Sequence, residues 1–400
     1  MQKKIIKYFI KWTSALCGIS SFAFYLSSCT KNQMVLVRDY DFVSLDPSLT
    51  GNLAALGFKP TIQSLYNNET MVPEYVADLN VKTEAGQQPS SANAELWLSR
   101  KVQAMYGYSY NQSALPEGAS KHFITYESVM NEKIIEALKD RVDASAFEYA
   151  KTWSFDKGLL NLATALDKIL ETKNHQSIFN SELSPQQFVN KIQHQLVNKI
   201  NLFHKDDILQ TPKSISFWGA SYGPNWVSNK LSFDEYGPST SYPGWMFDQK
   251  DSLNLVPSVP TDQNYKLSVK PFNGFNTLGW NPTVGTYEPK AVQQAFYQSS
   301  DYVVVAIESW INNDVNVKKI KSHFEPILKS GLSSNNIIIV DVNQFSLSHF
   351  NFLGIEYSFN LLTQSILGEV AARKIVDTKI FNTENLRVLS ENEFEFKTNN

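Results

Sequence analysis

The chain has 400 residues, and 42% of them are hydrophobic, which is enough apolar material for two hydrophobic cores. Its formal net charge of −3 is nearly neutral and argues against a general electrostatic affinity for nucleic acid. The only two cysteines are Cys17 and Cys29, so the sequence does not have the composition of a disulfide-stapled protein.

The N-terminus has the layout of a secretory signal. Four lysines precede an apolar stretch from Trp12 to Leu26, and the letters LSSC end it at Cys29. A cysteine after leucine and two small residues resembles the cleavage site of bacterial lipoproteins, in which this cysteine is acylated. The alternative is an uncleaved anchor helix, because the apolar run approaches the roughly 20 residues of a membrane span. We expect residues 1–28 to be a lipoprotein signal peptide and Cys29 to carry palmitate, which anchors the protein on the extracytoplasmic face of the cell membrane.

The body of the protein begins with a predicted α/β unit. Residues 35–45 are rich in β-forming side chains and predict a strand. A turn at residues 46–48 follows, and three leucines then recur at helical spacing before Gly57, which suits the end of a helix. Helical periodicity returns at residues 126–138 and 158–170.

A longer amphipathic helix is predicted in the middle of the chain. It begins at Pro185, its apolar residues recur every three or four positions to about Ile208, and Pro212 ends it. Helices and strands then alternate, with a buried strand at residues 302–307 and a final helix at residues 353–376. The pattern predicts two α/β halves joined by one long helix.

The sequence contains none of the common catalytic or nucleotide-binding motifs, such as G-x-S-x-G, H-E-x-x-H or a phosphate-binding glycine loop. Its six histidines are scattered without the spacing of metal ligands, and only His349, after a predicted strand end, is a candidate for ligand contact. We therefore predict no catalytic residues, no metal site and no cofactor.

The stretch FVSLDPSLTGNLAALGFKP, at residues 42–60, resembles the start of the class III (cluster A) substrate-binding proteins of ABC importers. That family binds iron siderophores, haem and cobalamin. The order and spacing of later segments are similar to the family as well, and the resemblance covers nearly the whole mature chain. These segments are NEKIIEALKDRVDASAF, WSFDKGLLNLATAL, TYEPKAVQQAFYQSSDYVVV and IIIVDVNQFSLSHFNFLGIEYSFNLLTQSI.

The resemblance implies an α/β fold of two Rossmann-like lobes that are joined by a single long helix, with the ligand cleft between the lobes. It assigns residues 29–183 to the N-terminal lobe, 184–210 to the inter-lobe helix and 211–400 to the C-terminal lobe. Such a protein is not an enzyme. Its expected partners are an ABC permease with its ATPase and a small-molecule ligand, together with the membrane through the lipid anchor, and no nucleic acid.

Aromatic residues form 13% of the chain, and many lie in predicted loops. Large planar ligands such as haem or catecholates are held by stacking and edge contacts of such rings. Trp218 and Trp310, each after a strand-like run, are the strongest candidates. The full set of candidates for ligand contact is Tyr106, Tyr108, Tyr110, Trp218, Tyr222, Trp226, Trp280, Trp310 and His349.

The family docks on its permease through one glutamate of each lobe. Glu288 matches the C-lobe glutamate, and Glu132 is the nearest N-lobe match, with Glu127 as its alternative. The chain departs from the family in its long loops and in lacking a clear arginine cluster, which argues against recognition of citrate-type anions.

Three other functions remain open at this level. The same fold can bind another solute such as a bare metal ion, or it can serve as a surface adhesin. A lipid-anchored hydrolase is disfavoured by the missing motifs.

Overall fold

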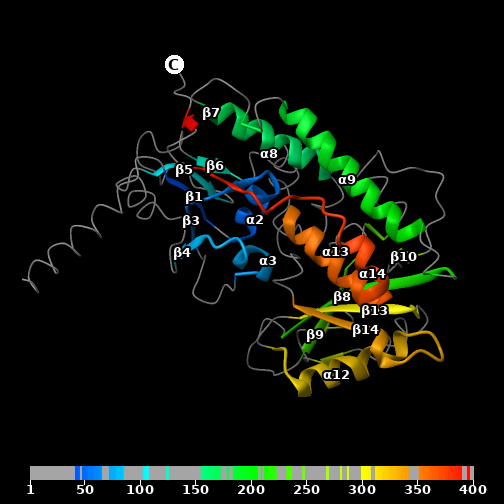
Figure 1. Cartoon of the computed structure of the whole chain (residues 1–400). Coiled ribbons are helices and arrows are strands. Elements are labelled where there is room, and N and C mark those ends of the chain that lie inside the picture. Colours follow the sequence, from blue (N-terminus) through cyan, green and yellow to red (C-terminus); the bar gives the residue numbers. More distant parts are fainter. Residues whose placement is uncertain are drawn as a thin grey trace, which may run out of the picture.

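A computed structural model provides the coordinates (Figure 1). It describes residues 41–45, 47–64, 72–84, 102–107, 123–125, 155–172, 178–179, 183–205, 209, 211–222, 231–236, 246–247, 267–269, 280–281, 286–287, 299–307, 311–341, 351–389 and 394–396. The signal segment and Cys29 lie outside these residues, so their assignments remain predictions. None of the described helices is both long and apolar enough to cross a membrane.

The N-terminal sheet has five parallel strands in the order β4-β3-β1-β5-β6. Their bounds are β1 Asp41–Ser44, β3 Ile62–Ser64, β4 Lys82–Glu84, β5 Val102–Gly107 and β6 Phe123–Thr125. Helix α2 (Pro47–Ala55) follows β1, and its leucines Leu49 and Leu53 are fully buried. Gly57 has a φ of +87°, the left-handed conformation that ends many helices. The predicted helix is confirmed, and so is the strand over residues 41–44, whereas α2 already begins at Pro47, within the turn predicted at residues 46–48.

The helix predicted at Pro185 is confirmed as α9 (Pro185–Lys205), the longest described helix. A reciprocal capping box starts it: Ser184 Oγ accepts from Gln187 N, and Gln187 Oε1 accepts from Ser184 N at 2.9 Å. The described part of the helix reaches Lys205, and the predicted end at Ile208 lies outside the described residues. The preceding helix is α8 (Phe155–Ile169), which continues directly into β7 (Leu170–Thr172).

The C-terminal sheet has four parallel strands in the order β10-β8-β13-β14, and β9 pairs antiparallel with β8. The strands are β8 Lys213–Tyr222, β9 Leu231–Tyr236, β10 Leu267–Val269, β13 Tyr302–Ile307 and β14 Ile337–Asp341. Helix α12 (Asp314–Phe324) begins at Asn313, whose side chain accepts from Asn316 N. The short helices η5 (Glu325–Ile327) and η6 (Ser334–Asn336) lead into β14.

Both faces of the C-terminal sheet are buried, which explains the continuous apolar run of β13. Val304 and Ala306 belong to the large core cluster, whereas Val303, Val305 and Ile307 belong to a second cluster with α12. This alternation follows from the two-residue period of a strand.

After the C-terminal sheet, the chain returns toward its N-terminal half. Helices α13 (Phe352–Leu367) and α14 (Glu369–Val376) are followed by β15 (Arg387–Val388) and β16 (Phe394–Phe396). Strand β15 pairs with β2 (Phe58–Lys59), and β16 pairs with β7. The division at residue 211, which assigns everything beyond it to a C-terminal lobe, therefore differs from the structure for these last strands.

Arg387 holds the C-terminal segment against the N-terminal half through three contacts. Its backbone N–H donates to Gly57 O at 2.9 Å, its guanidinium lies 5.0 Å from the centroid of the Phe58 ring, and its side chain donates to Ile178 O. Leu389 N then bonds to Lys59 O. A cation over an aromatic ring and a new backbone ladder both stabilise this junction.

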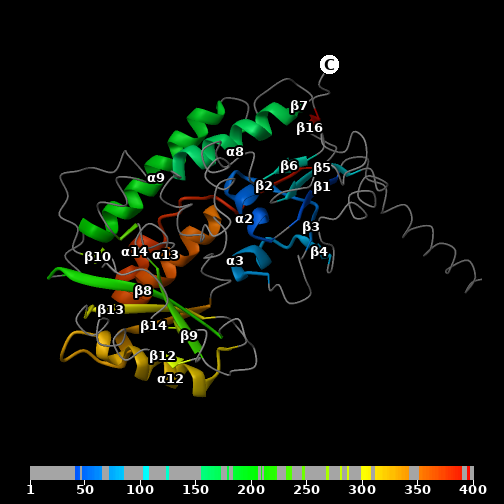
Figure 2. The same ribbon diagram turned by 180° about the vertical axis from the view of Figure 1, so that it is seen from behind.

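The two sheets lie apart, and α9 extends from beside α8 to the side of the C-terminal sheet, as Figures 1 and 2 show from opposite sides. The α/β fold with two parallel sheets, predicted from the sequence, is confirmed. Helix α13 lies between α2 and the C-terminal sheet, so α9 is not the only link between the halves. The other described elements are α3 (Glu74–Ala77), β11 (Trp280–Asn281) and β12 (Thr286–Tyr287).

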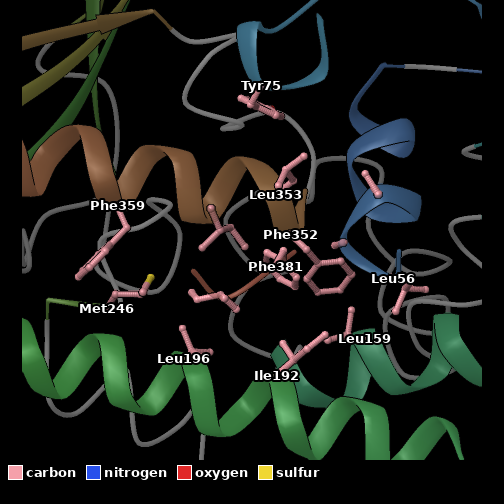
Figure 3. Close-up of a cluster of buried hydrophobic side chains, with 14 of the residues drawn as sticks. Leu56, Tyr75, Leu159, Ile192, Leu196, Met246, Phe352, Leu353, Phe359 and Phe381 are labelled. Carbon is pink, nitrogen blue, oxygen red and sulfur yellow. The ribbon is translucent and has the colours of Figure 1, made fainter. Parts of the chain in front are cut away.

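One large core cluster joins the halves (Figure 3). Phe352 and Phe359 of α13 lie in it with Leu196 and Ile192 of α9. The N-terminus of α13 also makes a close polar contact with α2, because Phe352 N donates to Asn52 Oδ1 at 2.9 Å. The halves are therefore held in one arrangement by buried contacts in addition to the chain connections.

Candidate ligand-binding site

Most of the predicted ligand-contacting residues stand at or after the carboxyl ends of parallel strands. Tyr108 and Tyr110 come directly after β5, and Trp310 comes three residues after β13. Trp226 follows β8, and His349 follows β14. The carboxyl ends of parallel strands meet at one edge of a sheet, which is where open α/β sheets bind ligands. These five residues lie outside the described part of the chain, so their contacts remain predictions.

Three other candidates lie on described strands, although only their backbones are described. Tyr106 is the penultimate residue of β5 and pairs with Ser44 of β1. Tyr222 ends β8 and pairs with Leu231. Trp280 lies in β11, opposite Tyr287 in a two-stranded antiparallel ladder. Tyr106 and Tyr222 thus stand at the carboxyl edges of the two different sheets.

Trp218 occupies a core position. Its side chain is 2% exposed and packs against Phe324 of α12, with the ring centroids 5.2 Å apart. Strand β8 continues to Tyr222, so Trp218 lies in the middle of the strand instead of at its end. Because Phe217 faces the large core, its neighbour Trp218 faces α12. This placement favours a structural role for Trp218 over ligand contact.

The structure brings together three polar side chains that the sequence analysis did not select. The register of the N-terminal sheet places Ser44, Gln63 and Thr83 side by side on β1, β3 and β4. We call them the polar row. Gln63 Nε2 donates to Thr83 Oγ1 at 2.9 Å. The backbone position of Tyr106 is next in the same register, so the row extends toward one of the predicted aromatic contacts.

The polar row lies near the carboxyl edge and shares a face with Phe42, because residues two apart on a strand point to the same side. Phe42 belongs to the large core cluster that joins the halves. The row is therefore on the side of the sheet that faces the rest of the molecule. One feature of the sequence could have drawn attention to this row: Gln63 is a long polar side chain within the strand segment Ile62–Ser64.

The charged cluster around Asp301 lies at the opposite, amino edge of the C-terminal sheet. Asp301 accepts hydrogen bonds from Ser214 N at 2.7 Å and from Lys329 Nζ at 2.5 Å, and Lys213 Nζ is 3.5 Å away. Burial alone would raise the pKa of Asp301, but the hydrogen bonds from Lys329 and Ser214 lower this pKa below its ordinary value. Its partners are all within the protein, so we interpret this cluster as structural.

His204 is a buried histidine of α9. Its Nε2–H donates to Met246 O at 3.1 Å, and burial lowers its pKa from 6.5 to about 4 in spite of that bond. The ring is therefore neutral at physiological pH. Among the described residues, no group of three histidine, cysteine, aspartate or glutamate side chains is placed to hold a metal ion. The predicted docking residues Glu132 and Glu288 lie outside these residues.

No family model matches the chain, and no curated protein matches it. Similar solved structures include the periplasmic heme binding protein HutB of Vibrio cholerae, with 14% identity and a TM-score of 0.40 over 81% of this chain and 98% of that chain.

Two further structures have comparable values. A FhuD fold-family periplasmic binding protein component of a Fep/Fec-like ferrichrome ABC transporter from Bacillus subtilis has 13% identity and a TM-score of 0.44, over 83% of this chain and 95% of that chain. The iron uptake ABC transporter substrate-binding protein PiaA from Streptococcus pneumoniae has 11% identity and a TM-score of 0.42, over 83% and 93%.

Proposed function

We propose that this chain is an extracytoplasmic, lipid-anchored solute-binding protein of an ABC importer, of the class III type. It binds an iron complex, either a siderophore or haem, or a related macrocycle, and delivers it to a membrane permease. One observation carries the proposal: aromatic candidates stand at or shortly after strand carboxyl ends in two separate parallel sheets, and α9 and α13 connect the halves that contain these sheets. Sites between α/β units of this kind hold ligands without a chemical step.

In the proposed mechanism the protein binds and releases its ligand, and it makes or breaks no bond. Rings from the two sheets, with Tyr108 on one side and Trp310 on the other, stack on the ligand and exclude water. Glu132 and Glu288 then contact the permease. Because α9, α13 and the C-terminal return all connect the halves, we expect closure around the ligand to be small.

Titration of the full-length protein with haem, ferrichrome and cobalamin tests this function. Binding would be measured by calorimetry and by the change in tryptophan fluorescence. We expect one of these compounds to bind with a dissociation constant in the micromolar range or below. If none of the three binds, the proposed function is wrong.

Two tryptophan variants provide a matched pair. Trp310→Leu should weaken binding and leave the stability of the fold nearly unchanged. Trp218→Leu should lower the stability by about 2–3 kcal/mol, which is less than the cost of truncating a buried tryptophan to alanine because leucine keeps part of the packing, and leave the affinity of the folded protein unchanged. Loss of affinity only in Trp218→Leu would contradict the placement of the site.

The lipid anchor is tested separately through Cys29. Cells that produce the protein would be fed a labelled palmitate analogue, and the membrane fraction would be separated from the soluble fraction. We expect label and membrane attachment for the native sequence and neither for Cys29→Ala. Equal membrane attachment of both proteins would instead favour an uncleaved anchor helix.

A further inference from the structure

Gln63 lies in the middle of the polar row, on the strand between β1 and β4 (Figure 1). Its side chain is 1% exposed, although it stands one residue from the carboxyl end of β3. A buried amide at the carboxyl edge of a parallel sheet is unusual, because glutamine is mostly exposed in proteins. This edge is also where ligands of open α/β sheets are contacted.

The hydrogen bonds of Thr83 fix the orientation of the Gln63 amide. Thr83 Oγ1 donates its proton to Val81 O at 3.4 Å. A threonine hydroxyl has one proton, so it accepts from Gln63 and cannot also donate to it. The amide nitrogen of Gln63 must therefore face Thr83, and Gln63 Oε1 remains as an acceptor.

Gln63 Oε1 is buried and has no hydrogen-bond partner within the part of the chain that the structure describes. A buried acceptor without a donor is destabilising, and folded proteins rarely keep one without a use. The strands on both sides of β3 pair with its backbone, so they hold the Gln63 side chain at a fixed position in the sheet. A ligand that supplies a donor would remove the cost of this acceptor.

We propose that Gln63 is a polar anchor of the ligand site, with Oε1 accepting a hydrogen bond from an N–H or O–H group of the bound ligand. This inference rests on the proposed function and narrows its ligand class. An acceptor selects chelates or macrocycles that carry amide N–H or hydroxyl groups. It does not select haem, whose peripheral polar groups are carboxylates at neutral pH and are themselves acceptors. Thr83 is a positioning residue, because it acts only by orienting the amide.

The test compares Gln63→Met with Gln186→Met as a matched control. Gln186 is an exposed glutamine at the start of α9, bonded to Asn190, far in sequence from the polar row. Each variant of the full-length protein would be titrated with ferrichrome and cobalamin, which carry amide N–H groups, and with haem. The urea midpoint of each ligand-free variant would be measured alongside.

Ferrichrome or cobalamin, whichever the native protein binds, should bind to Gln63→Met with an affinity about five- to tenfold lower than to the native protein. A loss of this size is the effect of one lost hydrogen bond. Any binding of haem should be unchanged. The urea midpoint of Gln63→Met should stay equal or rise, because methionine leaves no buried acceptor. Thr83→Val should weaken the same binding by a smaller factor, since it frees the amide to rotate. Gln186→Met should match the native protein in both measurements.

Several outcomes would overturn the anchor. If Gln63→Met keeps the native affinity for ferrichrome and cobalamin, the anchor is wrong, and the proposed function is not affected. An equal loss of affinity for haem, or a fall in the urea midpoint without any change in affinity, would show that Gln63 has a structural role only. If the native protein binds haem alone among the three, the anchor is wrong and the function is right. Failure of the native protein to bind any of them rejects both.

Discussion

Replacing Lys199 by methionine should destabilise the protein strongly, because it removes the cation of a buried ion pair between α9 and α13. Lys199 is 0% exposed, and its Nζ lies 3.0 Å from Glu356 Oε1 and 2.7 Å from Thr378 O. Burial lowers the pKa of Lys199 below its ordinary value, although Glu356 counteracts this. Removing one member of such a pair typically costs about 3–5 kcal/mol.

The other contacts of Glu356 indicate that the loss in the free energy of unfolding should lie at the lower end of that range. Its Oε1 accepts from Ile380 N at 2.7 Å, and its Oε2 accepts from Phe381 N at 3.1 Å. The carboxylate therefore keeps two donors after Lys199→Met, and we expect a loss of about 3 kcal/mol in the free energy of unfolding. Lys199→Met/Glu356→Gln removes both charges, and its amide oxygen keeps one of the two backbone donors while the amide NH2 group faces the other. The double variant should lose only about 1–2 kcal/mol.

Urea unfolding of the native protein, the two single variants and the double variant completes the measurement. Circular dichroism and tryptophan fluorescence would be followed together, because coinciding transitions are needed for the free energies to be meaningful. The two substitutions should be strongly non-additive. Two results would refute this reasoning: a loss below about 1 kcal/mol in the free energy of unfolding of Lys199→Met, or effects of the two single substitutions that add up within error. Either result would mean that the two charges are solvated and interact only weakly, as exposed ion pairs do.

Two further predictions concern stability. The pKa of His204 is about 4 in the folded protein and 6.5 in the unfolded chain. Between these pH values the unfolded chain binds the proton more readily. The free energy of unfolding therefore falls on acidification from pH 6.5 to pH 4, by about 3 kcal/mol in all. His204→Gln should flatten this part of the profile in urea unfolding at a series of pH values, and an unchanged slope would assign the dependence to other groups. Gly51→Ala should lower the thermal midpoint by the equivalent of about 2–3 kcal/mol, because the added Cβ would lie 2.4 Å from Oδ1 of the buried Asn351, the cap of α13. Adding Asn351→Ser, a shorter capping residue, should restore part of the loss, and no restoration would contradict the assigned contact.

Local features of this fold could be predicted from the sequence because their causes are local. Helix α2, its stop at Gly57 and the start of α9 at Pro185 each depend on residues within a few positions of one another. The full length of β8 was predicted less well, because it depends on packing against distant segments. The core position of Trp218 follows directly from the longer strand.

The polar row could not be predicted, because it depends on the register between strands. Gln63 and Thr83 are 20 positions apart, and only the pairing of β3 with β4 places them side by side. The same holds for Lys199 and Glu356, which are 157 positions apart. Charged residues in helices are usually exposed, so nothing in the sequence distinguishes this pair from the other lysines and glutamates.

The return of the chain to its N-terminal half constrains how the protein acquires its structure. Strand β2 obtains its partner from β15, and Asn52 obtains its donor from Phe352, 300 positions later. Contacts between such distant positions form slowly, because closing a long loop costs entropy before any contact compensates for it. When the chain is synthesised or exported from its N-terminus, β2 therefore has no strand partner until Arg387 and Val388 are available to pair with it. We expect folding to finish only after the whole polypeptide has been made or moved across a membrane, with no early, self-sufficient first half.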